Sequence, residues 1–237
     1  MTSYFPDIDK VVIFRLLYRP ISYPFSRAAV SLNINPNLIT LIGFIVIIIA
    51  NISAVAGNIL AAILLTIVAQ IIDCVDGNVA RKTKNKTYLG KLVDGFVDAF
   101  GFTIYATISI GLSRQDIFAN QWCIIMVTGL VFSLSPIFNL LFKQRYDYVT
   151  GMMPISPKSM SSSRQEIKTA SFLKKISEFI DSNAMPSYPF ILMITLLIHS
   201  KLFLCAFIAL SGLTGIYCWL MIVARLKTNY AQLIMRR

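Results

Sequence analysis

Long apolar segments separated by short polar stretches dominate the chain. The first begins at Asn35-Pro36-Asn37, a typical start of a helix, and continues for 20 residues without a charged side chain. An apolar helix of about 20 residues can cross the hydrocarbon core of a bilayer. The pattern predicts six membrane-spanning helices, at residues 35–57, 58–81, 88–112, 120–142, 185–198 and 203–224. The fifth is short for a full crossing.

The segments outside these runs are polar and basic. Residues 8–33 mix apolar positions with arginines and two prolines, Pro20 and Pro24, which favours a helix at the membrane surface over a spanning one. Residues 143–186 form a long polar connection, in which 164–180 is expected to be a short surface helix.

We therefore predict an all-α polytopic membrane protein with six transmembrane helices and an N-terminal interfacial helix. Residues 1–34 would form the cytoplasmic or interfacial segment, and residues 35–237 the six-span membrane domain.

Composition supports a bilayer protein. Hydrophobic residues make up 56% of the chain and charged residues only 14%, with a mean hydropathy of +0.69. The net charge of +11 suits an anionic lipid surface or an anionic substrate, and we expect no nucleic-acid partner. Four cysteines without paired spacing are expected to be small core residues, not a disulfide or zinc framework.

The basic residues also predict an orientation. They gather in the N-terminal segment, in the loop at 81–86, in the 143–186 connection and at the C-terminus, while the opposite loops hold only Arg114 and Lys201. By the positive-inside tendency the basic side faces the cytoplasm. In a bacterium the membrane would be the inner or plasma membrane.

Four aspartates interrupt the apolar pattern. They are the only acidic residues between Lys10 and Gln115: Asp73, Asp76, Asp94 and Asp98. Carboxylates within membrane spans are costly unless they are paired or bind a cation, so we interpret them as a functional site. All four lie at the cytoplasmic ends of the second and third spans.

The spacing of the aspartates predicts that they converge. Asp73 and Asp76 share one helix face, and Asp94 and Asp98 form an i, i+4 pair on the next helix, which a short turn makes an antiparallel neighbour. Four carboxylates at close range need cations, and hard divalent ions bound by oxygen are expected. Glycines in both half-sites, Gly77 and Gly90, would let a ligand approach the backbone, and Arg81 offers a positive group for a phosphate.

At this point the residues resemble a known family. The string Asp73-x2-Asp76-Gly77-x2-Ala80-Arg81-x8-Gly90-x3-Asp94-x3-Asp98 is similar at every fixed position to the signature of the CDP-alcohol phosphotransferases. Residues 36–40 also resemble the opening of the first span in that family, and six spans agree with its topology. The resemblance is close over residues 36–112 and rests on hydropathy elsewhere.

The resemblance implies an enzyme of phospholipid biosynthesis. It would transfer a substituted phosphate from a CDP-linked donor to an alcohol and release CMP, using two divalent cations, Mg²⁺ or Mn²⁺. Asp73, Asp76 and Asp94 would hold the metals, while Asp98 would lie near the metals and also take the proton from the acceptor hydroxyl. The CDP pocket would be lined by six further residues: Gly77, Ala80, Arg81, Gly90, Asn37 and Thr40.

The substrates are less determined than the reaction. CDP-diacylglycerol is the favoured donor, because a lipid donor can enter from the bilayer; transfer from a CDP-aminoalcohol to diacylglycerol is the alternative. Three basic residues at cytoplasmic span ends, Lys143, Arg145 and Arg225, are candidates for binding a phosphorylated acceptor such as inositol phosphate or glycerol phosphate. Topology alone would place basic residues there as well.

Other functions remain open at this stage. The aspartates would also suit a structural ion network, or the cation site of a cation-coupled transporter, although a transporter leaves the glycines and Arg81 unexplained. A membrane prenyltransferase would need a second acidic cluster inside the spans, which the sequence lacks. Gly95 and Ala99 have the small-xxx-small spacing of closely packed helices, so a homodimer and packing within one chain both fit.

Overall fold

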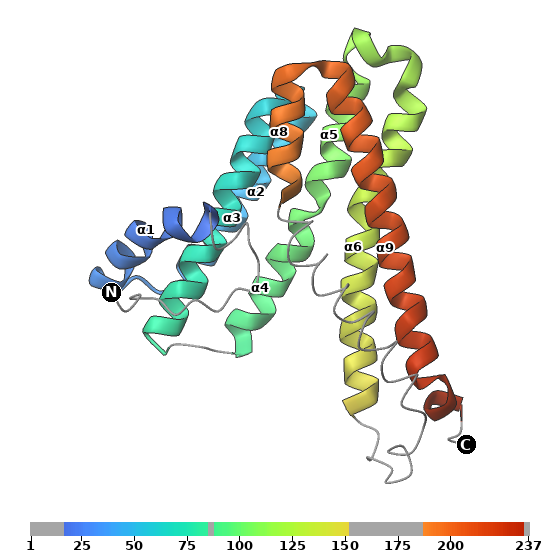
Figure 1. Cartoon of the computed structure of the whole chain (residues 1–237). Helices are drawn as coiled ribbons and strands as arrows, with labels where there is room; N and C mark the ends of the chain where they lie inside the picture. Colours follow the sequence, from blue (N-terminus) through green and yellow to red (C-terminus); the bar gives the residue numbers. More distant parts are fainter. Residues whose placement is uncertain (1–16, 85–87, 152–186, 235–237) are drawn as a thin grey trace.

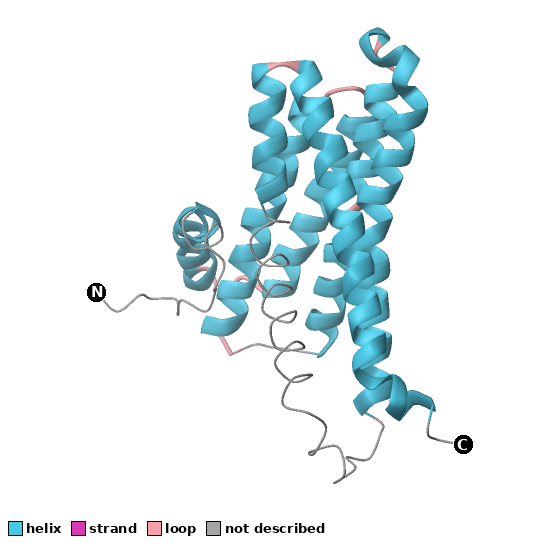
Figure 2. Cartoon of the chain, turned by 45° about the vertical axis from the view of Figure 1, so that its right-hand side comes forward, coloured by secondary structure: helices cyan, strands magenta, loops and turns pink. Residues whose placement is uncertain are grey.

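The structure, a computed structural model, describes residues 17–84, 88–151 and 187–234, and within these ranges it contains helices and short turns without strands (Figures 1 and 2). The all-α prediction is confirmed. The helices are α1 (Arg19–Ser31), α2 (Pro36–Val55), α3 (Ile59–Lys82), α4 (Tyr88–Gly101), α5 (Thr103–Ser113), the 3₁₀ helix η2 (Asp116–Gln121), α6 (Trp122–Gly151), α8 (Tyr188–Ile198) and α9 (Ser200–Ile234).

Five helical segments of the described chain are long and apolar enough to cross a membrane. They correspond to the first, second, third, fourth and sixth predicted spans: Pro36–Val55, Ile59–Lys82, Leu92–Ser113, Trp122–Tyr146 and Ser200–Val223. The predicted fifth span is represented by α8, which has 11 residues. Its first two residues, 185 and 186, lie outside the described residues, as does the predicted surface helix at 164–180. The chain is therefore an integral membrane protein with five candidate spans in its described part, and the count of six stays a prediction.

The N-terminal helix α1 lies across the end of α3 that carries Lys82 (Figure 1). It continues through Pro24, which the sequence pattern treats as a break. Its ring removes one backbone hydrogen bond, to the carbonyl oxygen of Pro20, and the helix continues despite that loss. Apolar side chains on its outer face, Ile21 and Phe25, are exposed. This arrangement agrees with a helix at the membrane surface, and that location stays a prediction.

The core lies between α3, α5, α6, α8 and α9. Tyr105 and Phe132 stack with their ring centroids 3.9 Å apart, and Phe207 packs on Phe132 from α9. Burial of such rings contributes about 1.5–3 kcal/mol each relative to exposure. Close helix contacts need small residues here: a Cβ on Gly111 would overlap the carbonyl oxygen of Ala54.

The cysteine prediction is right for two residues and wrong for two. Cys74 and Cys218 are buried, whereas Cys123 and Cys205 are exposed on the outer faces of α6 and α9. A thiol behaves as a small apolar group, so the hydrocarbon core of a bilayer accommodates it as well as the protein interior does. None of the four forms a disulfide.

The third predicted span is not one continuous helix. α4 ends at Gly101 and α5 begins at Thr103, with a break at Phe102. α4 packs on α2, through contacts that include Phe44 against Phe100, and more loosely on α5 and α6. Backbone contact between α3 and α4 is sparse among the described residues. The two half-sites therefore face each other across a gap, which the candidate site occupies.

Candidate active site

Three of the four aspartates lie close together at the ends of α3 and α4 that are predicted to face the cytoplasm. One carboxylate oxygen from each of Asp73, Asp76 and Asp94 lies within 4.8 Å of the other two. Asp76 is buried, Asp94 is half-buried and Asp73 is open to the gap. Carboxylates this close repel one another unless a cation joins them, and hard oxygen ligands are what Mg²⁺ and Mn²⁺ prefer. The residues present therefore fit a divalent metal site.

Thr40 fixes one of these carboxylates. Its hydroxyl donates a 2.6 Å hydrogen bond to Oδ2 of Asp76 and lies 3.2 Å from the carbonyl oxygen of Pro36. Both Thr40 and Asp76 are buried. A hydrogen bond to a metal-binding carboxylate orients it, and such partners tune metal affinity. The first span is thereby coupled to the acidic face of α3.

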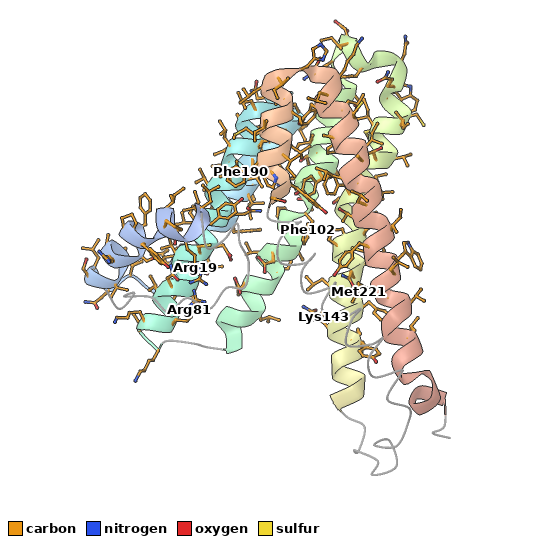
Figure 3. The ribbon with its side chains drawn as sticks, viewed as in Figure 1. Arg19, Arg81, Phe102, Lys143, Phe190 and Met221 are labelled. Atoms are coloured by element: carbon orange, nitrogen blue, oxygen red, sulfur yellow. The ribbon has the colours of Figure 1, made fainter. Side chains whose placement is uncertain are left out.

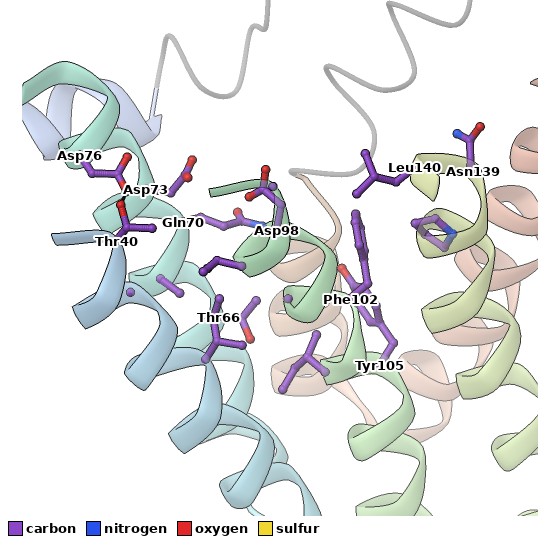
Figure 4. A pocket seen from close by; sticks show the side chains of 18 of the residues that line it. Thr40, Thr66, Gln70, Asp73, Asp76, Asp98, Phe102, Tyr105, Asn139 and Leu140 are labelled. Atoms are coloured by element: carbon purple, nitrogen blue, oxygen red, sulfur yellow. Dashed lines mark hydrogen bonds between the residues drawn. The ribbon is translucent and has the colours of Figure 1, made fainter. Parts of the chain in front are cut away.

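A cavity of about 480 Å³ opens beside the aspartates (Figure 4). Asp73, Asp76 and Asp98 form its acidic end, and Phe102, Tyr105 and Leu140 line its apolar side. Pro136 and Lys143 contribute the α6 wall. This volume suits a small ligand with both polar and apolar parts.

Asp98 holds a different position from the other three acids. It lines the cavity together with Asp73 and Asp76, but it does not belong to the group whose oxygens lie within 4.8 Å. Asp98 is exposed to the cavity, which leaves its carboxylate free to meet a ligand there. The structure thus separates a three-carboxylate group from a fourth carboxylate on the same cavity wall.

Arg81 is held in place by an asparagine within the signature. Its Nη2 donates a 2.9 Å hydrogen bond to Oδ1 of Asn78, and Nη1 of Arg19 on α1 donates to the same oxygen at 3.2 Å. The amide nitrogen of Asn78 donates to the hydroxyl oxygens of Ser22 and Ser26, both at 3.2 Å. Figure 3 shows the two arginines where α1 crosses α3.

Gly77 leaves room for the Arg81 guanidinium. A Cβ at Gly77 would lie 3.2 Å from Nη1 and 3.3 Å from Nη2 of Arg81, closer than most packed atoms approach. The arginine side chain therefore folds back over the bare backbone of α3. This explains the Gly-x2-Ala-Arg part of the signature as a packing requirement in addition to any ligand contact.

The remaining residues predicted to contact the donor lie elsewhere. Ala80 and Gly90 are half-buried, and neither they nor Gly77 and Arg81 are among the residues that line the cavity. Asn37 is exposed and does not line it either. The cap of α2 is Asn35, whose side chain accepts from the backbone N–H of Asn37 at 2.9 Å. Of the two residues predicted from the first span, the structure brings only Thr40 to the cavity.

The three candidate acceptor residues are also separated. Lys143 lines the cavity from α6, next to Asn139 and opposite the aspartates. Arg145 is exposed on the same helix and does not line the cavity. The side chain of Arg225, on α9, lies outside the described residues.

Sequence reasoning missed several polar residues of the site. Gln70 and Asn139 line the cavity, and Asn78 organises the arginines. One signal was available for Gln70, which precedes Asp73 by three residues and so shares its helix face. No such signal marked the other two residues. Asn78 occupies a variable position of the signature, and the polar residues of the span that contains Asn139 show no clear helical period.

Comparison with known proteins supports this site. Residues 33–148, which contain all four aspartates, match the family model of CDP-alcohol phosphatidyltransferase. An uncharacterized protein of Aquifex aeolicus (strain VF5) is 35% identical over 68 residues. That match covers 29% of this chain and 35% of the relative, so the chain spans about a third of the relative's length.

Proposed function

We propose that the protein, whose residues 33–148 belong to the CDP-alcohol phosphatidyltransferase family, transfers a substituted phosphate from a CDP-linked donor to an alcohol and releases CMP. The reaction would take place in phospholipid biosynthesis. The favoured donor is CDP-diacylglycerol. The observation that carries the proposal is the group of three carboxylate oxygens within 4.8 Å of one another at the end of a cavity that also contains Asp98.

The acidic group would hold two divalent cations, Mg²⁺ or Mn²⁺. Asp73, Asp76 and Asp94 are the proposed ligands, with Asp98 beside them. When bound, the metals would neutralise the donor diphosphate and make its phosphorus more electrophilic. The buried hydrogen bond from Thr40 would keep Asp76 oriented for this role.

Asp98 is the proposed base. The acceptor hydroxyl would donate its proton to the Asp98 carboxylate while its oxygen bonds to the phosphorus that carries the alcohol of the donor. The bond from that phosphorus to the bridging oxygen would break, and CMP would leave with the electron pair. The position of Asp98 on the cavity wall, outside the group of three, supports a role toward the acceptor.

The signature residues behind the acidic group would bind the CDP part. Arg81 would bind a phosphate of the donor through its guanidinium group. Gly77, Ala80 and Gly90 have small or no side chains, so the donor could approach the helix backbone closely. Asn37 is proposed to contact the donor from the start of α2. Catalysis would then depend chiefly on positioning and on neutralising charge at the phosphorus.

The acceptor would be a small alcohol. Lys143 is the candidate whose place on the cavity wall supports contact with an anionic group of the acceptor, and Arg145 and Arg225 are secondary candidates. In the alternative reaction a CDP-aminoalcohol would be the donor and diacylglycerol the acceptor. The apolar cavity side formed by Phe102, Ile104 and Leu140 is the feature that favours this alternative.

We further propose that the site faces the cytoplasm, that α1 lies at the membrane surface, and that the chain has six spans. The exposed apolar side chains of α2, including Leu41, Ile45 and Ile52, would contact membrane lipids.

Gly95 lines the cavity, so its small size has a role within one chain. A homodimer stays an independent proposal.

The decisive experiment is CMP release by the purified protein in lipid vesicles. A panel of CDP donors would be combined with a panel of alcohols, with and without Mg²⁺, Mn²⁺ and a chelator. We expect CMP only with metal, and only when a donor and an acceptor are both present. The matched control is Asp73→Asn, which removes one carboxylate at nearly constant volume.

Two results would overturn the proposal. CMP formation that survives chelation would contradict the metal-dependent mechanism. Cation flux across the vesicle membrane without CMP release from any donor would instead support the hypothesis of a cation-coupled transporter.

A further inference from the structure

Gln70 has an unusual environment for a polar residue of a membrane span. It lies on α3 three residues before Asp73, and it lines the same cavity as Asp73 and Asp98. Its side-chain oxygen Oε1 is buried and has no hydrogen-bond partner among the described residues. Buried polar atoms are nearly always partnered, so a partner supplied by a ligand is the natural explanation.

The neighbouring polar groups of the cavity do not share this property. Thr66, one turn earlier on the same helix, also lines the cavity, but its hydroxyl donates to the carbonyl oxygen of Ala62 at 2.8 Å. Thr40 is partnered by Asp76. Unlike these two hydroxyl groups, Oε1 of Gln70 has no hydrogen-bond partner in the described part of the chain.

The level of Gln70 along the helix identifies which substrate it would meet. With a rise of about 1.5 Å per residue, Gln70 lies about 4.5 Å deeper in the span than Asp73, away from the loop that follows Lys82. Asp98 lies about 6 Å deeper than Asp94 on the antiparallel helix. Gln70 and Asp98 are thus at the deep end of the site, and in Figure 4 the Gln70 side chain extends from α3 toward Asp98.

We propose that the carboxamide of Gln70 accepts a hydrogen bond from a second hydroxyl group of the acceptor, so that the acceptor is a polyol. This inference rests on the proposed function, in which Asp98 takes the proton of the attacking hydroxyl. A hydroxyl on the next carbon of the same molecule would then point to Gln70.

The chemistry of the cavity supports a polyol over a lipid alcohol. An amide oxygen accepts hydrogen bonds and needs an O–H or N–H donor. A polyol supplies such a donor beside the reacting hydroxyl, whereas diacylglycerol has a single hydroxyl, which the reaction consumes. Asn139 and Lys143 line the cavity from α6, so this wall is also polar.

The test pairs one change in the protein with one change in the substrate. CMP release would be measured with CDP-diacylglycerol and either glycerol 3-phosphate or 1,3-propanediol phosphate, which lacks only the middle hydroxyl. A second pair would be inositol and a deoxyinositol. Each acceptor would be tested with the parent protein, with Gln70→Met, which keeps length without a strong acceptor, and with the control Thr195→Val. Thr195 lies on α8 outside the cavity, and its hydroxyl also donates to a carbonyl oxygen of its own helix, that of Ile191 at 2.9 Å.

We expect the parent to prefer the intact polyol of at least one pair by about tenfold in kcat/KM, the effect of one hydrogen bond. Gln70→Met should raise the KM of that polyol about tenfold, abolish the preference and leave the KM of the donor within twofold. Thr195→Val should behave as the parent.

Several outcomes would overturn the inference without affecting the proposed function. These are a parent that makes CMP and accepts the deoxy analogues as readily as the polyols, a Gln70→Met protein with unchanged preference, and efficient transfer to diacylglycerol alone. If Gln70→Met fails to fold, the parent protein alone still tests the inference, because its kcat/KM for each polyol can be compared with that for the deoxy analogue. Absence of CMP from the parent with every donor and acceptor would instead refute the proposed function.

Discussion

Arg19 and Arg81 donate hydrogen bonds to the same atom, Oδ1 of Asn78, at 3.2 and 2.9 Å. One arginine comes from the N-terminal helix and the other from the signature. Arg19 is 4% exposed and Asn78 is fully buried, so this contact is part of the interior. The position of α1 is thereby linked to the position of Arg81.

Replacing Asn78 by alanine should weaken both folding and donor binding. The buried donors would lose their shared acceptor, which costs about 1–3 kcal/mol of stability. Arg81 would lose its anchor, so we expect the KM of the CDP donor to rise about tenfold while the KM of the acceptor stays unchanged. Thermal unfolding in detergent and CMP release would measure the two effects.

The control for this change is Asn51→Ala. Asn51 also bridges helices through a half-buried amide, accepting from Thr103 at 3.1 Å and Thr107 at 2.9 Å, but it does not line the cavity. It should lower the unfolding temperature to a similar extent without changing the KM of the donor. Equal changes in donor KM for both variants would mean that Asn78 acts on stability alone.

Thr40→Val should weaken metal binding. The variant removes the 2.6 Å hydrogen bond that orients Asp76 and keeps the shape of the side chain. Loss of such a partner lowers metal affinity about 10–100-fold. Titration of Mn²⁺ followed by electron paramagnetic resonance would report this directly, and Thr40→Ser should retain parental affinity. Unchanged Mn²⁺ affinity in Thr40→Val would argue against Asp76 as a ligand.

Asp98→Asn should separate chemistry from metal binding. Because Asp98 lies outside the group of three carboxylates, Mn²⁺ affinity should change little, while kcat should fall about 10²–10⁴-fold through loss of the base. Asp76→Asn provides the contrast, since it should lose both. If Asp98→Asn turns over at the parental rate, another group takes the proton.

Gly77→Ala should disturb Arg81. The new methyl group would lie 3.2 Å from Nη1, and the guanidinium is held by Asn78, so it has to shift by a few tenths of an ångström. A cost of about 1 kcal/mol raises the KM of the donor about fivefold. The control is Gly212→Ala on α9, where a Cβ meets no atom within 4 Å, and which should leave activity unchanged.

The proposed orientation can be tested with single cysteines in a background without the four native ones. Lys84 follows α3 at the end that bears the acids, and Gln121 ends η2 between α5 and α6. Both are exposed. A membrane-impermeant maleimide applied to intact cells should label Gln121→Cys but not Lys84→Cys. The reverse pattern would place the site on the outer side of the membrane.

Much of the fold can be predicted from local patterns of hydropathy and residue spacing. Apolar runs of the length of a bilayer predicted α2 and α3 with boundaries close to those found, because each run must satisfy its backbone polar groups within itself. They also predicted α6 and α9, but these helices continue past the predicted ends at 142 and 224, to Gly151 and Ile234. The spacing of the aspartates predicted that all four would converge, since periodicity sets the face of a helix. Asp73, Asp76 and Asp94 do so, whereas Asp98 lies outside their group.

Other features depend on packing between distant segments. Whether the apolar run at 185–198 crosses the membrane is not decided by its hydropathy, and Cys123 and Cys205 turned outward because lipid and protein core favour the same side chains. The helix break at Phe102 lies within an apolar run whose hydropathy does not mark it.

The proposed donor end is predicted from spacing along the chain: four carboxylates, two glycines and an arginine on two helices. The cavity between helices, its lining by Gln70 and Lys143, and the contact of Arg19 with Asn78 are visible only in the folded chain. These contacts join residues far apart in the chain, and their geometry follows from how whole helices pack, which no local spacing encodes.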